Sequence, residues 1–294
     1  MSRSIKLKKG FDIRIKGAAN SVLATADEPV IYGVKPVDFP GLTPKLNVKP
    51  GDKVQAGSAL FHDKLQPEIL FTSPVSGTVL AVERGDRRKM LEVTVEKSGN
   101  EQINFGKTDP ASLTPDQIKE KLLLSGLWPA IRQRPYHIIA KPGDRPKAIF
   151  ISGFDTSPLA PDYNFIIDNS SAQAFQTGLN ALSKLTDGKI NLVLNGVVTP
   201  SSVLTGMKGV EISFFSGPHP AGNVGVHIHH LSPLNKGEKV WIVNLQDVVA
   251  IGTLFVEGIY KPERIIALTG SEVLHPQYYK VLSGCSVKTI VNNN

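Results

Sequence analysis

Three closely spaced histidines, His227, His229 and His230, are the residues in this sequence that most resemble metal ligands. In a β-strand, His227 and His229 would lie on one face, as paired imidazole ligands of zinc do. No third ligand and no acidic partner stand at a recognisable spacing from them. The sequence therefore predicts no metal site and favours histidines at a strand edge or an interface, where they would titrate near neutral pH.

Trp128, Arg132 and Arg134 form a second group, within SGLWPAIRQRP. An arginine can donate hydrogen bonds to ring carbonyls while an aromatic side chain stacks on the ring, so these three residues are candidates for holding a quinone. The alternative is that the two arginines bind the carbonyl groups of a helix C-terminus or a partner protein. The sequence leaves both interpretations open.

A nucleotide or flavin site is not supported in the same segment. Such sites need a glycine-rich loop, because glycine lets several backbone N–H groups approach a phosphate. Here Gly126 is the one glycine between residues 126 and 135, and Trp128 and Pro129 add bulk. Cys285 is the sole cysteine, which excludes an internal disulfide and a cluster held by four cysteines of this chain. No sequence motif assigns a catalytic residue.

The composition is that of a folded protein with a basic surface. The 294 residues are 41% hydrophobic and 20% charged, with a net charge of +7. Small basic clusters occur at residues 6–9 and 84–89, and the sequence does not assign a role to the second. A solvated basic surface, an anionic membrane surface and an acidic partner are all favoured over nucleic acid. The chain has no apolar run long enough to cross a bilayer and no apolar signal segment, so we expect a soluble, unexported protein.

Two kinds of secondary-structure pattern divide the chain. Residues 42–98 hold short β-branched runs separated by turn dipeptides, including a predicted hairpin that pairs residues 78–83 with 90–96. Thr114-Pro115-Asp116-Gln117 then predicts a helix start. Strands at 147–152, 189–196 and 209–217 and a helix at 170–185 predict a βαβ unit in a mostly parallel sheet. We also expect a functional loop at 153–169, a buried helix at 244–258, and strands at 263–270 and 286–291.

The stretches VKPGDKVQAGSAL and SPVSGTV resemble the barrel-sandwich hybrid of lipoyl and biotinyl carrier domains. In those domains the modified lysine stands at the tip of a tight hairpin. Folding ALFHD back on EILFTS places the tip near Gln66 and Pro67, so Lys64 lies on the ascending side of the loop. We therefore predict that Lys64 is not an attachment site.

Four stretches resemble the NqrA family, a component of the Na⁺-translocating NADH:quinone oxidoreductases: IKLKKGFDIRIKGAA, SGLWPAIRQRP, GPHPAGNVGVHIHHLSPL and NLQDVVAIGTLFVEG. The resemblance implies an α+β multidomain fold. Residues 1–104 would form a barrel-sandwich hybrid (biotinyl/lipoyl-like) domain with an N-terminal extension. Residues 105–258 would form a Rossmann-like α/β domain, and residues 259–294 the truncated start of an SLBB-like β-grasp domain.

The resemblance also implies a function. The chain would be a cofactor-free peripheral component on the cytoplasmic side of the bacterial inner membrane, and alone it would not be catalytic. Partner subunits would carry the flavins and iron–sulfur centres that pass electrons from NADH to ubiquinone or menaquinone while Na⁺ is exported. The alternatives are an NADH-oxidising flavoprotein similar to that of the Rnf complex, and a lipoyl or biotinyl carrier protein.

Overall fold

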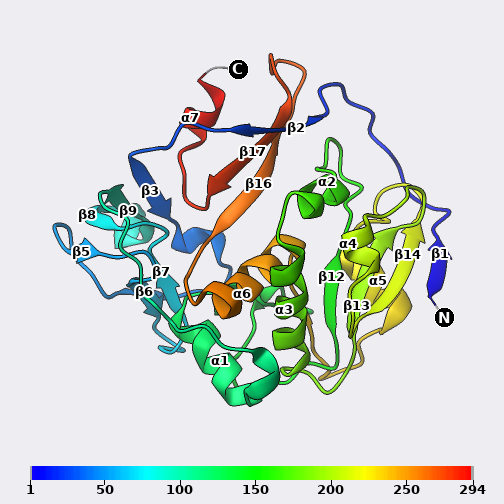
Figure 1. Ribbon diagram of the computed structural model, residues 1–294, viewed down its shortest axis with the longest axis horizontal. Helices are drawn as coiled ribbons and strands as arrows, with labels where there is room; N and C mark the ends of the chain where they lie inside the picture. The colour runs from blue at the N-terminus through cyan, green and yellow to red at the C-terminus, as the bar shows by residue number, and fades with distance from the viewer. Residues whose placement is uncertain (1, 293–294) are drawn as a thin grey trace.

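The computed structural model describes residues 2–292 and arranges them around four β-sheets (Figure 1). The strands are β1 (Arg3–Lys6), β2 (Asn20–Thr25), β3 (Ile31–Val34), β4 (Pro44–Leu46), β5 (Lys53–Val54), β6 (Ala59–Asp63), β7 (Leu70–Thr72), β8 (Gly77–Arg84), β9 (Met90–Lys97), β10 (Arg132–Arg134), β11 (Ile138–Ile139), β12 (Ile149–Ser152), β13 (Ile190–Asn195), β14 (Glu211–Ser216), β15 (Val240–Ile242), β16 (Glu263–Leu268) and β17 (Gln277–Leu282). The helices are α1 (Pro115–Leu124), α2 (Tyr163–Asp168), α3 (Ala172–Ser183), α4 (Ser202–Thr205), α5 (Val224–Leu231), α6 (Leu245–Glu257) and α7 (Val287–Val291).

Two small sheets, β3-β9-β8-β5 and β4-β6-β7, build the β domain that is predicted by the short β-branched runs and turn dipeptides of residues 42–98. Its core is formed by alternating apolar residues such as Phe61, Val79 and Val93, which are almost fully buried. The predicted hairpin is confirmed, since β8 pairs antiparallel with β9. The β6–β7 hairpin pairs His62 with Leu70, which centres its loop on Gln66, as predicted.

Helix α1 begins where its capping signal places it. The Thr114 hydroxyl accepts the Gln117 backbone N–H at 3.3 Å, and the Gln117 side chain accepts the Thr114 N–H at 2.9 Å. The predicted capping box is thus confirmed, and it leads the chain from the β domain into the α/β domain.

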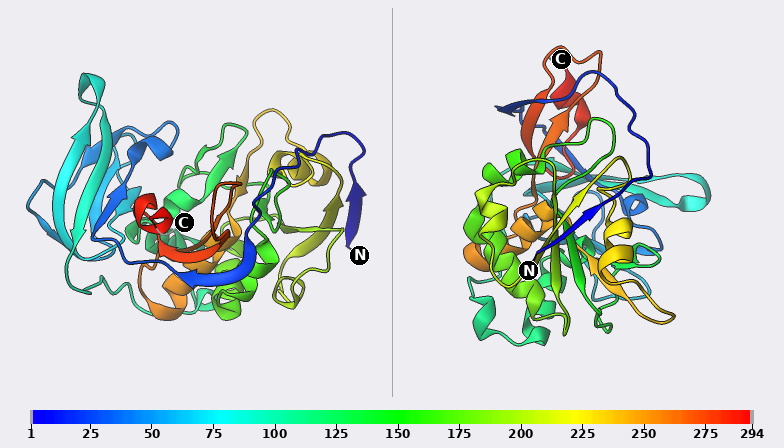
Figure 2. Two further views of the ribbon diagram at one scale, coloured as in Figure 1. Left: turned by 90° about the horizontal axis from the view of Figure 1, so that it is seen from above. Right: turned by 90° about the vertical axis from the view of Figure 1, so that its right-hand side faces the viewer.

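The α/β domain is built on a seven-stranded sheet of order β1-β14-β13-β12-β15-β10-β11. The neighbours from β1 to β15 are parallel, and β10 and β11 are antiparallel, so the mostly parallel sheet and its βαβ unit are confirmed. Apolar residues of α3 and α6 belong to the core on one face of the sheet, and Ile228 of α5 packs with Phe150 on the other. Figure 2 shows these helices on opposite sides of the strands.

Helices α3 and α6 cross at two glycines. A Cβ atom on Gly252 would lie 1.6 Å from the Ala174 carbonyl oxygen, and one on Gly178 would lie 2.1 Å from the Val248 carbonyl oxygen. The backbones approach so closely because neither position carries a side chain. Helix α6 is buried over most of its surface, as its continuous apolar sequence predicts.

Strand β2 from the N-terminal part of the chain and strands β16 and β17 from the C-terminal part build a third unit. Strand β16 pairs antiparallel with β17, and β2 adds parallel to β17, while β1 lies on the far edge of the large sheet beside β14 (Figure 1). The segment between β1 and β2 therefore links two sheets. The predicted strand at 263–270 is confirmed.

Two local predictions are wrong in part. Residues 287–291 form helix α7 and not a strand, because Ile290 is buried in a single helical turn that overrides the β-propensity of Val287 and Thr289. The connection at 153–169 is not all loop, since it contains α2, which begins after the capping residue Asp162. Within residues 2–292 no helix is long and apolar enough to span a membrane.

Candidate functional site

A cavity of about 500 Å³ lies where the β domain, the large sheet and the third unit meet. Phe39 and Phe71 line it from the β domain, Ser152 and Ile242 from the large sheet, and Arg264 from β16. No single unit forms these walls alone. The cavity is large enough for a ring-sized organic ligand.

The cavity opens at a reversal in the order of the parallel strands. From β12 the chain continues to β13 and β14 on one side, whereas β15 lies on the other side. Ser152 ends β12, and Asn244 follows β15 and caps the N-terminus of α6. In open parallel sheets, ligands bind outside the carboxyl ends of the strands at such a switch point.

Aromatic side chains form much of the cavity wall. The rings of Phe39 and Phe71 meet edge to face with centroids 4.7 Å apart. Tyr163 and Tyr260 also line the cavity, and burial raises the pKa of both phenols. Asn244 beside Tyr163 and Thr72 beside Tyr260 act in the opposite direction on these pKa values.

Arg132 supplies a cation in this wall. Its guanidinium carbon lies 4.7 Å from the centre of the Phe39 ring, and its Nη1 atom is buried without a hydrogen-bond partner. Burial lowers the pKa of Arg132, while the negative charges of Asp247 and Asp38 oppose that shift. The guanidinium group stays charged because an arginine pKa remains far above neutrality. It can therefore donate a hydrogen bond to a ligand oxygen.

Arg134 and His137 lie beside Arg132. Arg134 does not line the cavity, but its Nε atom is also buried without a partner, and burial lowers its pKa. His137 lines the cavity, and burial together with the charges of Arg134 and Arg132 lowers its pKa. A pKa below 6.5 leaves this imidazole neutral at pH 7. The sequence indicated the two arginines, whereas it gave no signal for His137.

Trp128, which the sequence suggested as a stacking partner for a quinone ring, does not face the cavity. Its side chain is fully buried, its indole N–H donates to the Ala140 carbonyl at 2.7 Å, and its ring meets Trp241 edge to face at 5.5 Å. The neighbouring residues Leu127 and Pro129 line the cavity instead. Trp128 therefore supports the cavity wall from behind and has no free face on which a ring could stack.

Gly126 has a packing role. Its backbone has φ of 76°, and a Cβ atom there would lie 2.3 Å from Thr72 Oγ1. The Thr72 hydroxyl donates to the Ser125 carbonyl at 3.1 Å, which joins the β domain to this turn. The glycine thus permits contact between two units and needs no phosphate to explain it.

The three histidines lie on helix α5 and not on a strand, so that expectation is wrong. Residues two apart on a helix point in directions about 200° apart, which separates His227 from His229. His227 is fully buried, its Nε2 lies 2.8 Å from the Ala221 carbonyl oxygen, and burial lowers its pKa to about 4. Within residues 2–292 no three histidine, cysteine, aspartate or glutamate side chains are grouped as metal ligands.

Lys64 and Cys285 lie outside the cavity wall. Lys64 is exposed directly after β6, and its backbone N–H donates to the Thr43 carbonyl at 2.7 Å. This position is off the hairpin tip, while the absence of a lipoyl or biotinyl group on it stays a prediction. Cys285 is half-buried, and burial raises the pKa of its thiol, which disfavours the nucleophilic thiolate.

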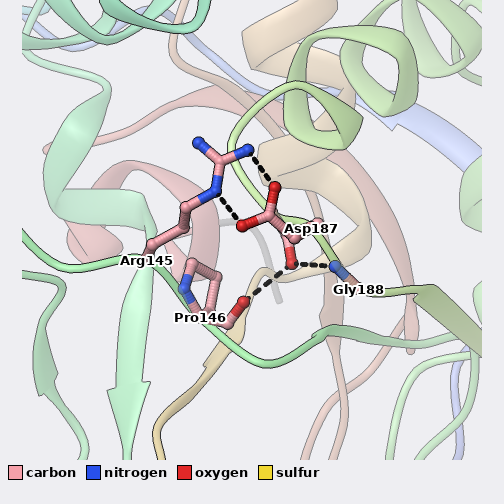
Figure 3. Close-up of polar contacts among 5 residues, drawn as sticks. Arg145, Pro146, Asp187 and Gly188 are labelled. Carbon is pink, nitrogen blue, oxygen red and sulfur yellow. Dashed lines mark hydrogen bonds and ion pairs between the residues drawn. The ribbon is translucent and has the colours of Figure 1, made fainter.

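A second, polar hollow at the amino ends of the strands has its charges paired (Figure 3). Arg145 donates two hydrogen bonds of 2.6 Å to Asp187, and the Thr186 hydroxyl bridges Pro146 and Gly188. Lys147 pairs with Glu238 at 2.8 Å, and Lys239 with Asp144 at 2.6 Å. These pairs hold neighbouring loops together and leave little charge for a ligand.

Comparison with known proteins adds to this geometry. The model of the NqrA second alpha/beta domain matches residues 113–260, which is half of the chain, and the model of the NqrA N-terminal barrel-sandwich hybrid domain matches residues 5–98. The chain belongs to the NqrA family. In this NqrA-family chain, the cavity lies between the two matched domains and β16.

Relatives that are components of Na(+)-translocating NADH-quinone reductases support the assignment to the NqrA family. The chain is 42% identical to the protein of Yersinia pestis over 293 residues, 39% identical to that of Neisseria meningitidis over 292 and 40% identical to that of Klebsiella pneumoniae over 293. The alignments cover 97%, 97% and 98% of this chain. The chain spans 64% of the length of each of these relatives.

Proposed function

We propose that this chain serves as the peripheral NqrA component of a bacterial Na⁺-translocating NADH:quinone oxidoreductase and docks on its other subunits. The names of the relatives and the two domain matches support this role. The complex would pass electrons from NADH to ubiquinone or menaquinone and export Na⁺. Flavins and iron–sulfur centres would belong to partner subunits, and this chain would lie on the cytoplasmic side of the inner membrane.

The finer architecture belongs to the same proposal. The α/β domain, expected at residues 105–258, would be a Rossmann-like variant in which the phosphate-binding glycines are lost. The parallel strands β12 to β14 and the packing role of Gly126 support this interpretation. Residues 259–294 would begin an SLBB-like β-grasp domain, for which the β16–β17 hairpin would be the opening element.

The cavity would hold the quinone ring, and Arg132 is the observation that carries this proposal. A quinone has two carbonyl oxygens that accept hydrogen bonds and a flat face that stacks on aromatic rings. The guanidinium group of Arg132, which lines the cavity, would donate to one carbonyl, while Phe39 and Phe71 would contact the ring. These two phenylalanines would take the stacking role that the sequence suggested for Trp128, and Arg134 would strengthen the positive field behind Arg132.

A titration of the chain with short-chain ubiquinone by isothermal calorimetry tests the site. Arg132→Gln should weaken binding about tenfold or more, because a hydrogen bond to a charged donor is lost. Arg145→Gln is the matched control, because it also removes one guanidinium, but at the far hollow. Equal affinity of the two variants, or no binding by the unaltered chain, would exclude the quinone site in this cavity.

The cofactor-free role has its own test. We expect the purified chain to show no stoichiometric flavin or iron–sulfur absorption, and an NADH titration followed by fluorescence should not saturate at micromolar concentrations. A saturable NADH signal would instead indicate a flavoprotein of the Rnf type. An unchanged intact mass after expression with biotin or lipoate is expected if Lys64 is not an attachment site.

A further inference from the structure

The β8–β9 hairpin projects from the body of the molecule (Figure 2). Its tip carries a cluster of positive charge. The basic tip is defined as residues 84–89, in which Arg84, Arg87, Arg88 and Lys89 are exposed and Asp86 is the one acidic residue. Within residues 2–292 none of these four cations takes part in an ion pair. The positive charge of the cluster is thus not neutralised by an ion pair in the part of the chain that the structure describes.

The backbone of the basic tip adopts a conformation that is uncommon for arginine. Arg87 and Arg88 have φ of 53° and 60°, in the left-handed region where glycine is the ordinary residue. The turn is closed by Gly85 N–H donating to the Lys89 carbonyl at 2.9 Å, and the Arg84 side chain donates to the Arg88 carbonyl at 2.9 Å. Two arginines in this conformation, where glycine would fit better, indicate that their side chains have a function.

Two leucines add apolar surface to the hairpin. The pairing of β8 with β9 shifts register at Leu80 and again next to Leu91, and these side chains are 47% and 38% exposed. Leu91 lies against Gly85 at the base of the tip. The four cations at the end of the projection would therefore meet a membrane surface first, with the two leucines behind them.

The size of the tip favours lipid over a protein partner. A specific protein interface usually buries about 800 Å² on each side, which a loop of six residues cannot supply by itself. A lipid headgroup layer needs no matching surface, because each lysine or arginine near it adds attraction independently. We propose that the basic tip binds the anionic lipid headgroups of a membrane surface. This proposal does not rest on the quinone site.

Vesicle flotation with the purified chain tests the proposal. The chain should float with phosphatidylcholine vesicles that contain one quarter phosphatidylglycerol at low salt, and not with pure phosphatidylcholine. Arg87→Gly/Arg88→Gly should bind about 25-fold more weakly, since each cation near such a surface contributes about fivefold. The same variant should be at least as stable to denaturant as the unaltered chain, because glycine relieves the left-handed backbone.

Two further variants separate the tip from overall charge. Lys208→Gln/Lys236→Gln removes two exposed cations elsewhere and has the same net charge as the Arg87→Gly/Arg88→Gly variant. It should nevertheless bind nearly as well as the unaltered chain, because its basic tip is intact. Arg87→Lys/Arg88→Lys keeps the charges and should retain binding. The proposal is overturned if the glycine and glutamine variants weaken binding equally, or if the unaltered chain binds no anionic vesicles. The second result would favour an acidic protein surface as the partner.

Discussion

His227 shows how a single residue can tie the stability of this fold to pH. Its ring lies between Phe154 and Phe215, with centroids 5.6 and 4.7 Å away, and its Nδ1 has no hydrogen-bond partner. Burial lowers the pKa to about 4, although the contact with the Ala221 carbonyl acts in the opposite direction. The folded protein therefore holds this histidine neutral, while the unfolded chain protonates it near pH 6.5.

The predicted consequence is a loss of stability in acid. Because the unfolded state binds the proton first, the contribution of His227 is constant above about pH 6.5 and falls as pH drops toward 4. The expected loss at pH 5 is about 2 kcal/mol relative to pH 7.5, measured by urea unfolding. His227→Gln should remove most of this pH dependence, even if it lowers stability at pH 7.5. His229→Gln, an exposed control, should keep it, and identical pH profiles for both variants would contradict the argument.

At the scale of elements, the crossing of α3 and α6 fixes the helical layer over the large sheet. Gly178 and Gly252 allow the contact, and each faces a backbone carbonyl of the other helix that cannot move aside as a side chain could. The N-terminus of α6 lies in the cavity wall through Asn244 and Asp247. The glycine contact thus helps to position the site.

Gly252→Ala should destabilise the protein by about 2 to 4 kcal/mol. Alanine favours a helix over glycine by about 1 kcal/mol, but the overlap with the Ala174 carbonyl forces the helices apart and costs more. Urea unfolding measures the change. Gly143→Ala is the control, because a Cβ atom there meets nothing within 4 Å. If Gly252→Ala proved as stable as this control, the close approach of the helices would be wrong.

The elements also show why part of the fold could be predicted. Helix α1 and the β8–β9 hairpin carry their signals locally, in the Thr114 capping box and in alternating apolar residues flanking a turn. Helices α5 and α7 do not, because the alternation of Val226, Ile228 and His residues and the β-branched Val287 and Thr289 suit a strand as well as a short helix. For such short segments the tertiary contacts of Ile228 and Ile290 decide.

On the scale of the whole molecule, the cavity depends on how three units dock. The sequence pointed to Arg132, but Phe39, Asp247 and Arg264 lie far from it in the chain and carry no local motif. The orientation of Trp128 is decided by packing within the α/β domain, since its partner Trp241 comes from β15, far away in the sequence. Sequence patterns could therefore predict the small β domain, the mostly parallel sheet and one site residue, but not the wall of the cavity.

The negative charge of Asp247 stabilises the contact between α6 and β16 beside the cavity. Asp247 forms an ion pair with Arg264, which links α6 to β16, and its negative charge also opposes the pKa decrease of Arg132. Both arginines have a buried nitrogen without a partner. Removing the negative charge of Asp247 would leave the positive charges of Arg132 and Arg264 less well neutralised at a partly buried site.

Asp247→Asn should therefore lower the free energy of unfolding by about 2 to 3 kcal/mol. Arg264→Met alone should also destabilise, but the double variant should be more stable than the two separate losses predict, with a coupling energy of about 1 to 2 kcal/mol. Breaking the exposed Arg145–Asp187 pair should change stability far less, because water screens that pair. Strictly additive losses for Asp247→Asn and Arg264→Met would mean that this ion pair does not hold α6 and β16 together, and that apolar packing alone joins the units around the cavity.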